Sequence, residues 1–137
     1  MGLGYVLACD RCNYSFEGRT GKGMMYYDLN KLIPMIHYTR RKRLQEILDN
    51  HQVNHTDFDH RVYRCTKCLR LGTRFYVNVE YDNNQTFETV FKCSKCKHHL
   101  EDVSTLFNHL DFKEKIPFKC PNCLDFSLGV TDLIMWD

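Results

Sequence analysis

The sequence has few of the features that mark membrane proteins, secreted proteins or disordered chains. Its apolar runs, such as residues 5–8 and 133–136, hold four residues, whereas a helix that spans a bilayer takes about 20. Its first residues carry no basic segment ahead of an apolar one, so they do not resemble a secretory signal. Prolines number 3 and glycines 7, while 13% of the residues are aromatic, which excludes a disordered chain. We expect a folded cytoplasmic protein with no membrane partner.

The chain also lacks a strong excess of charge of either sign. Its 19 basic and 17 acidic residues give a formal charge of +2. If all eight cysteines bound two Zn²⁺ ions as thiolates, eight charges would be subtracted and four returned, leaving about −2 on the folded protein. Bulk charge therefore does not favour a nucleic-acid partner, and only local basic clusters remain as candidates.

What the sequence does contain is eight cysteines in four C-x-x-C pairs with none left over. The pairs are Cys9/Cys12, Cys65/Cys68, Cys93/Cys96 and Cys120/Cys123. In a reducing compartment, such pairs are more typical of metal ligands than of disulfides. Two pairs complete one tetrahedral site, so the four pairs predict two Cys₄ sites, each holding Zn²⁺ in a structural role. Iron is the less favoured metal, but it stays an alternative because thiolate ligands alone do not distinguish iron from zinc.

The spacing leaves open which pairs share an ion. Cys68 and Cys93, like Cys96 and Cys120, are separated by lengths typical of zinc ribbons, whereas Cys12 and Cys65 lie much farther apart. The four pairs are therefore assigned either sequentially, first with second and third with fourth, or nested, second with third inside first with fourth. Loop closure hardly separates these options, since doubling a loop adds only about 0.6 kcal/mol.

Several segments resemble small four-knuckle zinc-ribbon proteins of Firmicutes bacteria and their mobile elements. The resemblance spans most of the chain, and it implies cytoplasmic zinc proteins with the sequential pairing. It departs from the usual ribbon at the residue after each pair, where glycine is common and Asn13, Leu69, Lys97 and Leu124 stand instead. The segments that carry the resemblance are residues 9–14, 21–26, 63–65, 118–123 and 133–137.

Hydrophobic periodicity predicts a small, metal-stabilised, β-rich α+β fold. We expect strands at residues 5–8, 14–17, 74–81, 86–92, 98–103 and 126–136, with Phe75, Val77, Val79 and Tyr81 facing the core. A helical insertion over residues 24–50 contains a helix from about 39 to 49, because Pro34 interrupts the pattern. Residues 104–110 predict a short helical turn, and the polar stretch 51–61 predicts a loop.

These elements predict a single compact unit, 1–137, with two zinc-ribbon lobes. The first lobe spans about 1–72 and carries the helical insertion, and the second spans about 73–137. We expect packing rather than ligand binding for residues 24–27. Histidines 51, 55 and 60 are expected to be solvated rather than metal-bound.

We expect a non-enzymatic interaction module for a protein or nucleic acid, with no catalytic residue and no small-molecule substrate. The candidate contact residues are Arg40, Arg41, Lys42 and Arg43, a basic cluster on the expected helix. Phe75, Tyr76, Tyr81, Phe87 and Phe91 could also stack bases, but core packing is the favoured interpretation of the face that holds Phe75 and Tyr81. The alternative function is a rubredoxin-like or dithiol redox protein, and a hydrolase with one open zinc site is a third hypothesis.

Overall fold

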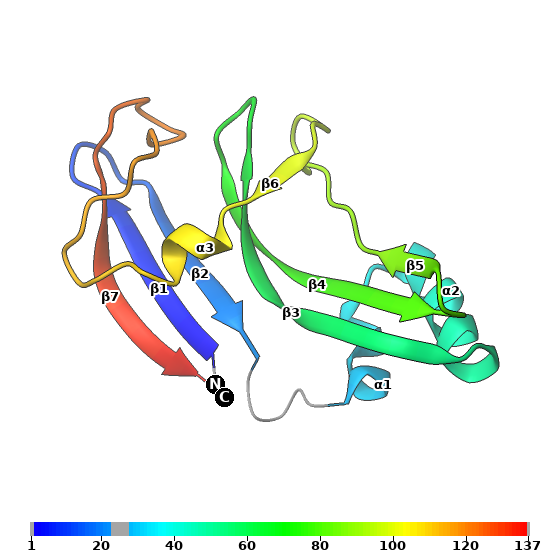
Figure 1. Ribbon diagram of the computed structural model, residues 1–137. Helices are drawn as coiled ribbons and strands as arrows, with labels where there is room; N and C mark the ends of the chain where they lie inside the picture. Colours follow the sequence, from blue (N-terminus) through cyan, green and yellow to red (C-terminus); the bar gives the residue numbers. More distant parts are fainter. Residues whose placement is uncertain (1, 23–27, 137) are drawn as a thin grey trace.

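The computed structural model describes residues 2–22 and 28–136 and shows a long, bent β-sheet, with the helices of residues 29–50 at one end and the short helix of residues 104–107 nearer its middle (Figure 1). In the described residues the strands run in the order β5-β4-β3-β2-β1-β7, and β6 pairs separately with β3. The elements are β1 (Gly2–Cys9), β2 (Ser15–Gly21), α1 (Leu29–Leu32), the 3₁₀ turn η1 (Ile33–Met35), α2 (Tyr38–Asn50), β3 (Val53–Cys65), β4 (Leu71–Tyr81), β5 (Gln85–Glu88), β6 (Leu100–Asp102), α3 (Ser104–Phe107) and β7 (Leu128–Trp136).

The predicted β-rich α+β class is confirmed, and so is most of the element order. Pro34 lies in η1, which separates the short α1 from the longer α2, as expected of a residue that cannot donate a backbone hydrogen bond. The residues predicted at 24–27 to pack in the core lie outside the described part of the chain. No helix within residues 2–22 and 28–136 combines the length and the apolar character needed to cross a membrane.

The loop predicted at residues 51–61 is wrong, because most of this stretch belongs to β3. This strand pairs antiparallel with β4 along most of its length, from Val53 opposite Tyr81 to Arg64 opposite Leu71. Its polar side chains satisfy one another on the strand surface, where Arg61 forms ion pairs with Asp57 at 3.1 Å and Asp59 at 2.7 Å. A strand stabilised by backbone pairing and ion pairs carries little of the apolar alternation that identifies strands in a sequence.

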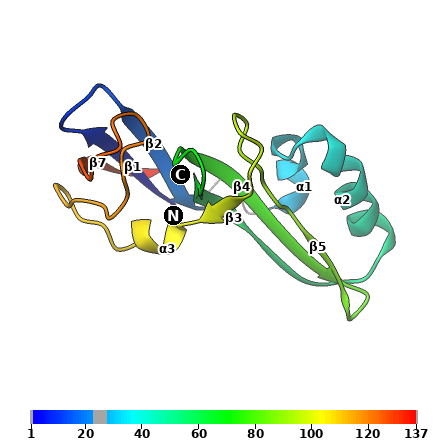
Figure 2. The ribbon, with the colours of Figure 1, turned by 90° about the horizontal axis from the view of Figure 1, so that it is seen from above.

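One hydrophobic core lies between the helices α1 and α2 and the strands β3, β4 and β5 (Figure 2). Leu44 and Ile47 of α2 are fully buried in it. They pack against the face of β4 that periodicity predicted to be buried, and all four of its residues lie in the core: Phe75, Val77, Val79 and Tyr81.

A second core lies between β1, β7 and the segment that includes α3. Tyr5 and Phe107 form its centre, with their ring centroids 5.5 Å apart in an edge-to-face arrangement. Val62 of β3 also belongs to this second core, whereas Phe58 of the same strand belongs to the first. β3 is therefore shared by both halves of the molecule.

The two halves of the sheet are joined in the middle by a short pairing and a brace. Within residues 2–22 and 28–136, the backbone pairing of β2 with β3 is limited to Gly21 opposite His60. The brace is formed where the Val62 amide donates to the Ser104 hydroxyl at 2.8 Å and the Val103 amide donates to the Val62 carbonyl at 2.9 Å. The cores do not divide the chain at residue 72, since β3 and β4 pair across this point and β7 joins β1. The structure thus divides the chain differently from the predicted lobes.

Replacement of a fully buried α2 side chain tests the first core. We expect Ile47→Ala to lower the free energy of unfolding by about 2–5 kcal/mol, because it removes buried methyl groups and leaves a cavity. The exposed Lys42 on the same helix supplies the control, and Lys42→Ala should change stability by less than about 0.5 kcal/mol. Urea denaturation of the metal-loaded proteins measures both values, and equal effects of the two variants would contradict the assigned core.

Candidate metal centres

The eight cysteines gather into two clusters of four. We call Cys9, Cys12, Cys120 and Cys123 the outer site, and Cys65, Cys68, Cys93 and Cys96 the inner site. In each cluster the sulfur atoms all lie within 4.8 Å of one another. The prediction that the cysteines group by fours is met by this geometry. The favoured sequential pairing, however, is wrong, because the structure has the nested arrangement in which the second and third pairs lie together.

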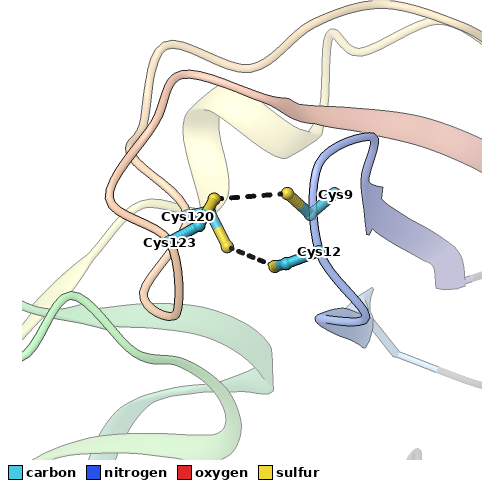
Figure 3. Close-up of side chains that lie close together, drawn as sticks. All are labelled: Cys9, Cys12, Cys120 and Cys123. Carbon is cyan, nitrogen blue, oxygen red and sulfur yellow. Dashed lines mark hydrogen bonds between the residues drawn. The ribbon is translucent and has the colours of Figure 1, made fainter.

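The outer site forms because the two ends of the chain lie side by side. The first pair occupies the turn between β1 and β2, and β7 runs antiparallel to β1 with Cys9 opposite Leu128. The fourth pair, which precedes β7, is thereby brought against the first. Figure 3 shows the four side chains pointing toward one another, with sulfur distances of 3.6 Å between Cys9 and Cys123 and 3.5 Å between Cys12 and Cys120.

The inner site is built on the same plan. Its first pair occupies the turn between β3 and β4, and its second pair precedes β6, which runs antiparallel to β3 with Cys65 opposite Leu100. The sulfurs again meet crosswise, at 3.2 Å between Cys65 and Cys96 and 3.5 Å between Cys68 and Cys93. Both sites therefore lie at the same end of the sheet, where the four cysteine loops gather at the top of Figure 1.

Backbone hydrogen bonds shape each cysteine loop in a similar way. The amide of each pair's first cysteine donates to the carbonyl five residues later, at 2.7–3.0 Å, as in Cys93 with His98. Amides within the loops also point at sulfur: those of Arg11 and Asn122 lie 3.3 and 3.4 Å from the Sγ atoms of Cys9 and Cys120. These contacts are what a thiolate ligand requires, because amide donors stabilise its negative charge.

The residue after three of the pairs adopts the left-handed conformation for which glycine is usual. Leu69, Lys97 and Leu124 have φ of 66°, 65° and 64°. Their amides donate to the carbonyls of Cys65, Cys93 and Cys120 at 2.9–3.0 Å, which closes each loop. The missing glycines thus leave the loop geometry intact, at an energetic penalty that each side chain carries.

The sulfur positions fit a tetrahedral thiolate-bound metal. A zinc–sulfur bond of about 2.3 Å places tetrahedral sulfurs about 3.8 Å apart, close to the 3.2–3.6 Å between facing sulfurs here. All eight cysteines are free thiols rather than disulfides. The first cysteine of every pair is buried and the second is partly exposed. Each site therefore has two buried and two partly exposed cysteines. Four protein sulfurs complete a tetrahedron, which is the arrangement of structural metal sites.

The two sites share an electrostatic conflict that a cation would relieve. Burial raises the pKa of Cys9, but hydrogen bonds from the Ser127 hydroxyl and the Arg11 amide outweigh it and lower this pKa to about 6. In the inner site, the amides of Cys96 and Lys95 lower the pKa of Cys93 to about 6. Burial and neighbouring sulfurs raise the pKa of Cys68 and Cys120 to about 11. Four sulfurs this close cannot all be thiolates without a positive charge between them.

Polar residues outside the cysteine pairs complete the outer site. Ser127 is buried, and its hydroxyl lies 2.9 Å from the Cys9 sulfur. Two exposed ion pairs cross from the first cysteine loop to the opposite side of the site, Arg11 with Asp125 at 3.4 Å and Asp10 with Lys115. Sequence analysis did not single out these residues. These residues lie close to the cysteine pairs in the sequence, but only the nested arrangement places Arg11 opposite Asp125 and Asp10 opposite Lys115.

The four basic residues predicted as contacts do not act as one surface. Arg41 donates to the carbonyls of Ile36 and Pro34, both at 2.6 Å, and Arg40 donates to the Glu88 carbonyl at 3.3 Å. Arg43 lies on another side of α2, where it contacts Glu46 and the Tyr81 hydroxyl at 3.0 Å. Arg40 therefore faces the end of β5, Arg41 turns back toward the 3₁₀ turn η1, and Arg43 faces the far end of β4.

The predicted aromatic and histidine candidates are mostly accounted for by packing. Phe75, Tyr81 and Phe87 are buried in the first core, and Phe91 packs edge-to-face on Tyr63. The Nδ1–H group of His51 donates a 2.6 Å hydrogen bond to the Asp82 carboxylate. The metal-site geometry found in residues 2–22 and 28–136 includes no histidine.

Comparison with known proteins found no matching protein-family model, curated protein or solved structure. The resemblance to four-knuckle zinc-ribbon proteins therefore stays a prediction, and the site must be interpreted from its own geometry.

Paired cysteine substitutions distinguish the nested from the sequential arrangement. Cys12→Ser with Cys123→Ser changes only the outer site, so we expect one metal ion to remain bound. Cys12→Ser with Cys68→Ser changes one cysteine in each site, so we expect neither site to retain its metal ion. Under the sequential arrangement the expectations are exchanged: the second variant would retain one ion and the first would retain none. Native mass spectrometry of the two double variants measures the metal count, and retention of one ion by the second variant alone would overturn the nested arrangement.

Glycine in the left-handed position should stabilise a cysteine loop. We expect Lys97→Gly to raise the free energy of unfolding by about 1 kcal/mol, because a side chain at positive φ is strained and glycine is not. The neighbouring exposed Lys95 provides the control, and Lys95→Gly should not stabilise. Thermal denaturation of the metal-loaded proteins tests this pair, and destabilisation by Lys97→Gly would show that the strain is absent.

Proposed function

We propose that this protein is a non-enzymatic interaction module whose two Cys₄ sites each bind a structural Zn²⁺. The observation that carries the proposal is the closure of both sites: each contains four sulfurs and is built from two cysteine loops that come from distant parts of the chain. A metal bound in this way cross-links a hairpin to the strand that returns beside it. The free energy of metal binding then contributes to the free energy of folding, because the four cysteines are not held together in the unfolded chain.

In both described clusters the fourth coordination position is filled by a cysteine, which supports a structural over a catalytic role. Catalytic zinc sites usually have three protein ligands and leave one position for water or substrate. Here the side chains of Cys9, Cys12, Cys120 and Cys123 supply a full set, and the inner site matches it. The surfaces around the sites, rather than the ions, are then the parts available for recognition.

The two hydrophobic cores are small, so metal ions that cross-link their segments would stabilise the fold. The outer-site core contains the two ends of the chain, where β7 pairs with β1. The inner site holds β6 and the segment after β5 against β3, where only three residue pairs are in register. Short pairings of this kind need a cross-link, and small domains commonly obtain one from a metal.

Metal analysis of the purified protein tests the proposal. We expect two zinc ions per chain by elemental mass spectrometry and no visible absorption band. Removal of the metal with a chelator should abolish the near-ultraviolet circular dichroism of the packed aromatic rings, because both cores lose their cross-links. Addition of Zn²⁺ should restore it.

Three results would contradict the proposal in different ways. A red or brown protein with iron would favour the electron-transfer alternative. Reversible disulfide formation within the pairs in the metal-free native protein would favour the dithiol alternative. Retention of the full fold after complete metal removal would exclude a structural role.

A further inference from the structure

A groove lies between the start of α2 and the segment that leads from β5 to the inner site. It measures about 880 Å³. One wall is formed by residues 35–41, the other by residues 89–94, and residues of β3 and β4 form its floor. We call it the α2 groove. Its volume falls within the range of about 300–1,000 Å³ that is typical of ligand-binding clefts.

The charge of the α2 groove is of one sign. Four cationic side chains line it, and none of its described lining residues is an aspartate or glutamate. Those cations are Arg40, Arg41, Arg74 and Lys92. Among the described residues, none of the four takes part in an ion pair within 4 Å. The nearby Glu88 directs its carboxylate to Tyr76 and Asn78 instead.

The arginines of the groove are held in place without being neutralised. Arg41 donates two hydrogen bonds and Arg40 one to backbone carbonyls, and Arg74 donates to the Thr73 carbonyl at 2.9 Å. A guanidinium group has five N–H donors, so each retains donors for a ligand. Preorganised cations without carboxylate partners favour an anionic ligand.

Aromatic rings lie beside these cations. Tyr38, at the first turn of α2, has 72% of its surface exposed, and its ring lies 4.6 Å from that of His37, tilted by 31°. Phe91 lines the opposite wall. Exposed rings near guanidinium groups offer stacking platforms for bases, whereas an acidic peptide would use the charges and leave the rings unused.

We propose that the α2 groove binds single-stranded nucleic acid, with phosphates on Arg40, Arg41, Arg74 and Lys92 and a base on Tyr38. A single strand fits better than a duplex, because bases stacked inside a duplex are not available to the rings. The volume of the groove suits a short segment of the strand. This proposal rests on the proposed interaction-module function and names its partner.

The inner site forms one end of the groove. Lys92 directly precedes Cys93, and its backbone bridges to His99 on the far side of the cysteine loop. At the other end of this wall, Thr89 is buried and exchanges hydrogen bonds with Val77 of β4, with the amide of each as a donor. Metal binding at the inner site would therefore hold Lys92 and Phe91 opposite α2.

The test uses the metal-loaded full-length protein and fluorescence anisotropy. The probes are fluorescein-labelled oligothymidine and oligouridine of about twelve nucleotides, a duplex of equal length, and an oligoglutamate peptide. We expect both single strands to bind more tightly than the duplex and the peptide. The logarithm of the association constant should fall with the logarithm of salt concentration with a slope of about −3, since each phosphate contact on a single strand contributes about −0.7.

Two charge-matched variants locate the binding surface. Arg40→Gln with Lys92→Gln removes two groove cations, so we expect about tenfold weaker binding and a slope reduced to about half. Lys42→Gln with Lys95→Gln removes two exposed cations that do not line the groove and should leave both quantities nearly unchanged. Tyr38→Ala should weaken binding without changing the slope, because stacking releases no counterions, and Tyr38→Phe should retain the affinity.

Each contrary result has a distinct meaning. Equal losses in the two charge variants, tighter binding of the duplex or the peptide, or no binding of either single strand at low salt would overturn the proposed partner. The zinc content is measured on the same samples. Two zinc ions without nucleic-acid binding would refute the groove proposal and leave the structural role of the metals intact, whereas binding without metal would refute that structural role instead.

Discussion

The structure depends on contacts between cysteine loops that are far apart in the chain. In both sites a loop at the turn of a hairpin faces a loop that precedes the strand returning to that hairpin, β7 for the outer site and β6 for the inner site. The crosswise sulfur distances, 3.2–3.6 Å, are similar in the two sites. The same local unit, a hairpin closed by a returning strand, is thus used twice and joined through β3.

Much of the local structure could be predicted from the sequence because it has a local cause. The strands on either side of the first cysteine pair, the break at Pro34 and the buried face of β4 follow from turn residues, backbone chemistry and apolar alternation. β3 could not be recognised in this way, since its polar residues are balanced by Arg61 and its aspartates rather than by burial. Because β3 was not predicted, the position of the second cysteine pair at the turn of the β3–β4 hairpin was not predicted either.

The pairing of the cysteine loops and the α2 groove share one reason for escaping sequence analysis: both depend on contacts between distant segments. Loop-closure entropy separates the two cysteine pairings by little, so register decides, through Cys9 opposite Leu128 and Cys65 opposite Leu100. The basic run on α2 was visible, but only folding separates Arg40 and Arg41 from Arg43 and brings Arg74 and Lys92 beside them. A continuous run of charge is therefore a poor guide to a charged surface.

The nested order of the two sites sets a sequence of events during synthesis. All four cysteines of the inner site lie between residues 65 and 96, so they leave the ribosome before the last two cysteines of the outer site. For that interval, Cys9 and Cys12 form a two-thiol hairpin whose returning strand does not yet exist. The first cysteines made therefore remain without their partner pair for the longest time, and the growing chain exposes these two thiols to soft metals and to oxidation for longer than any other pair.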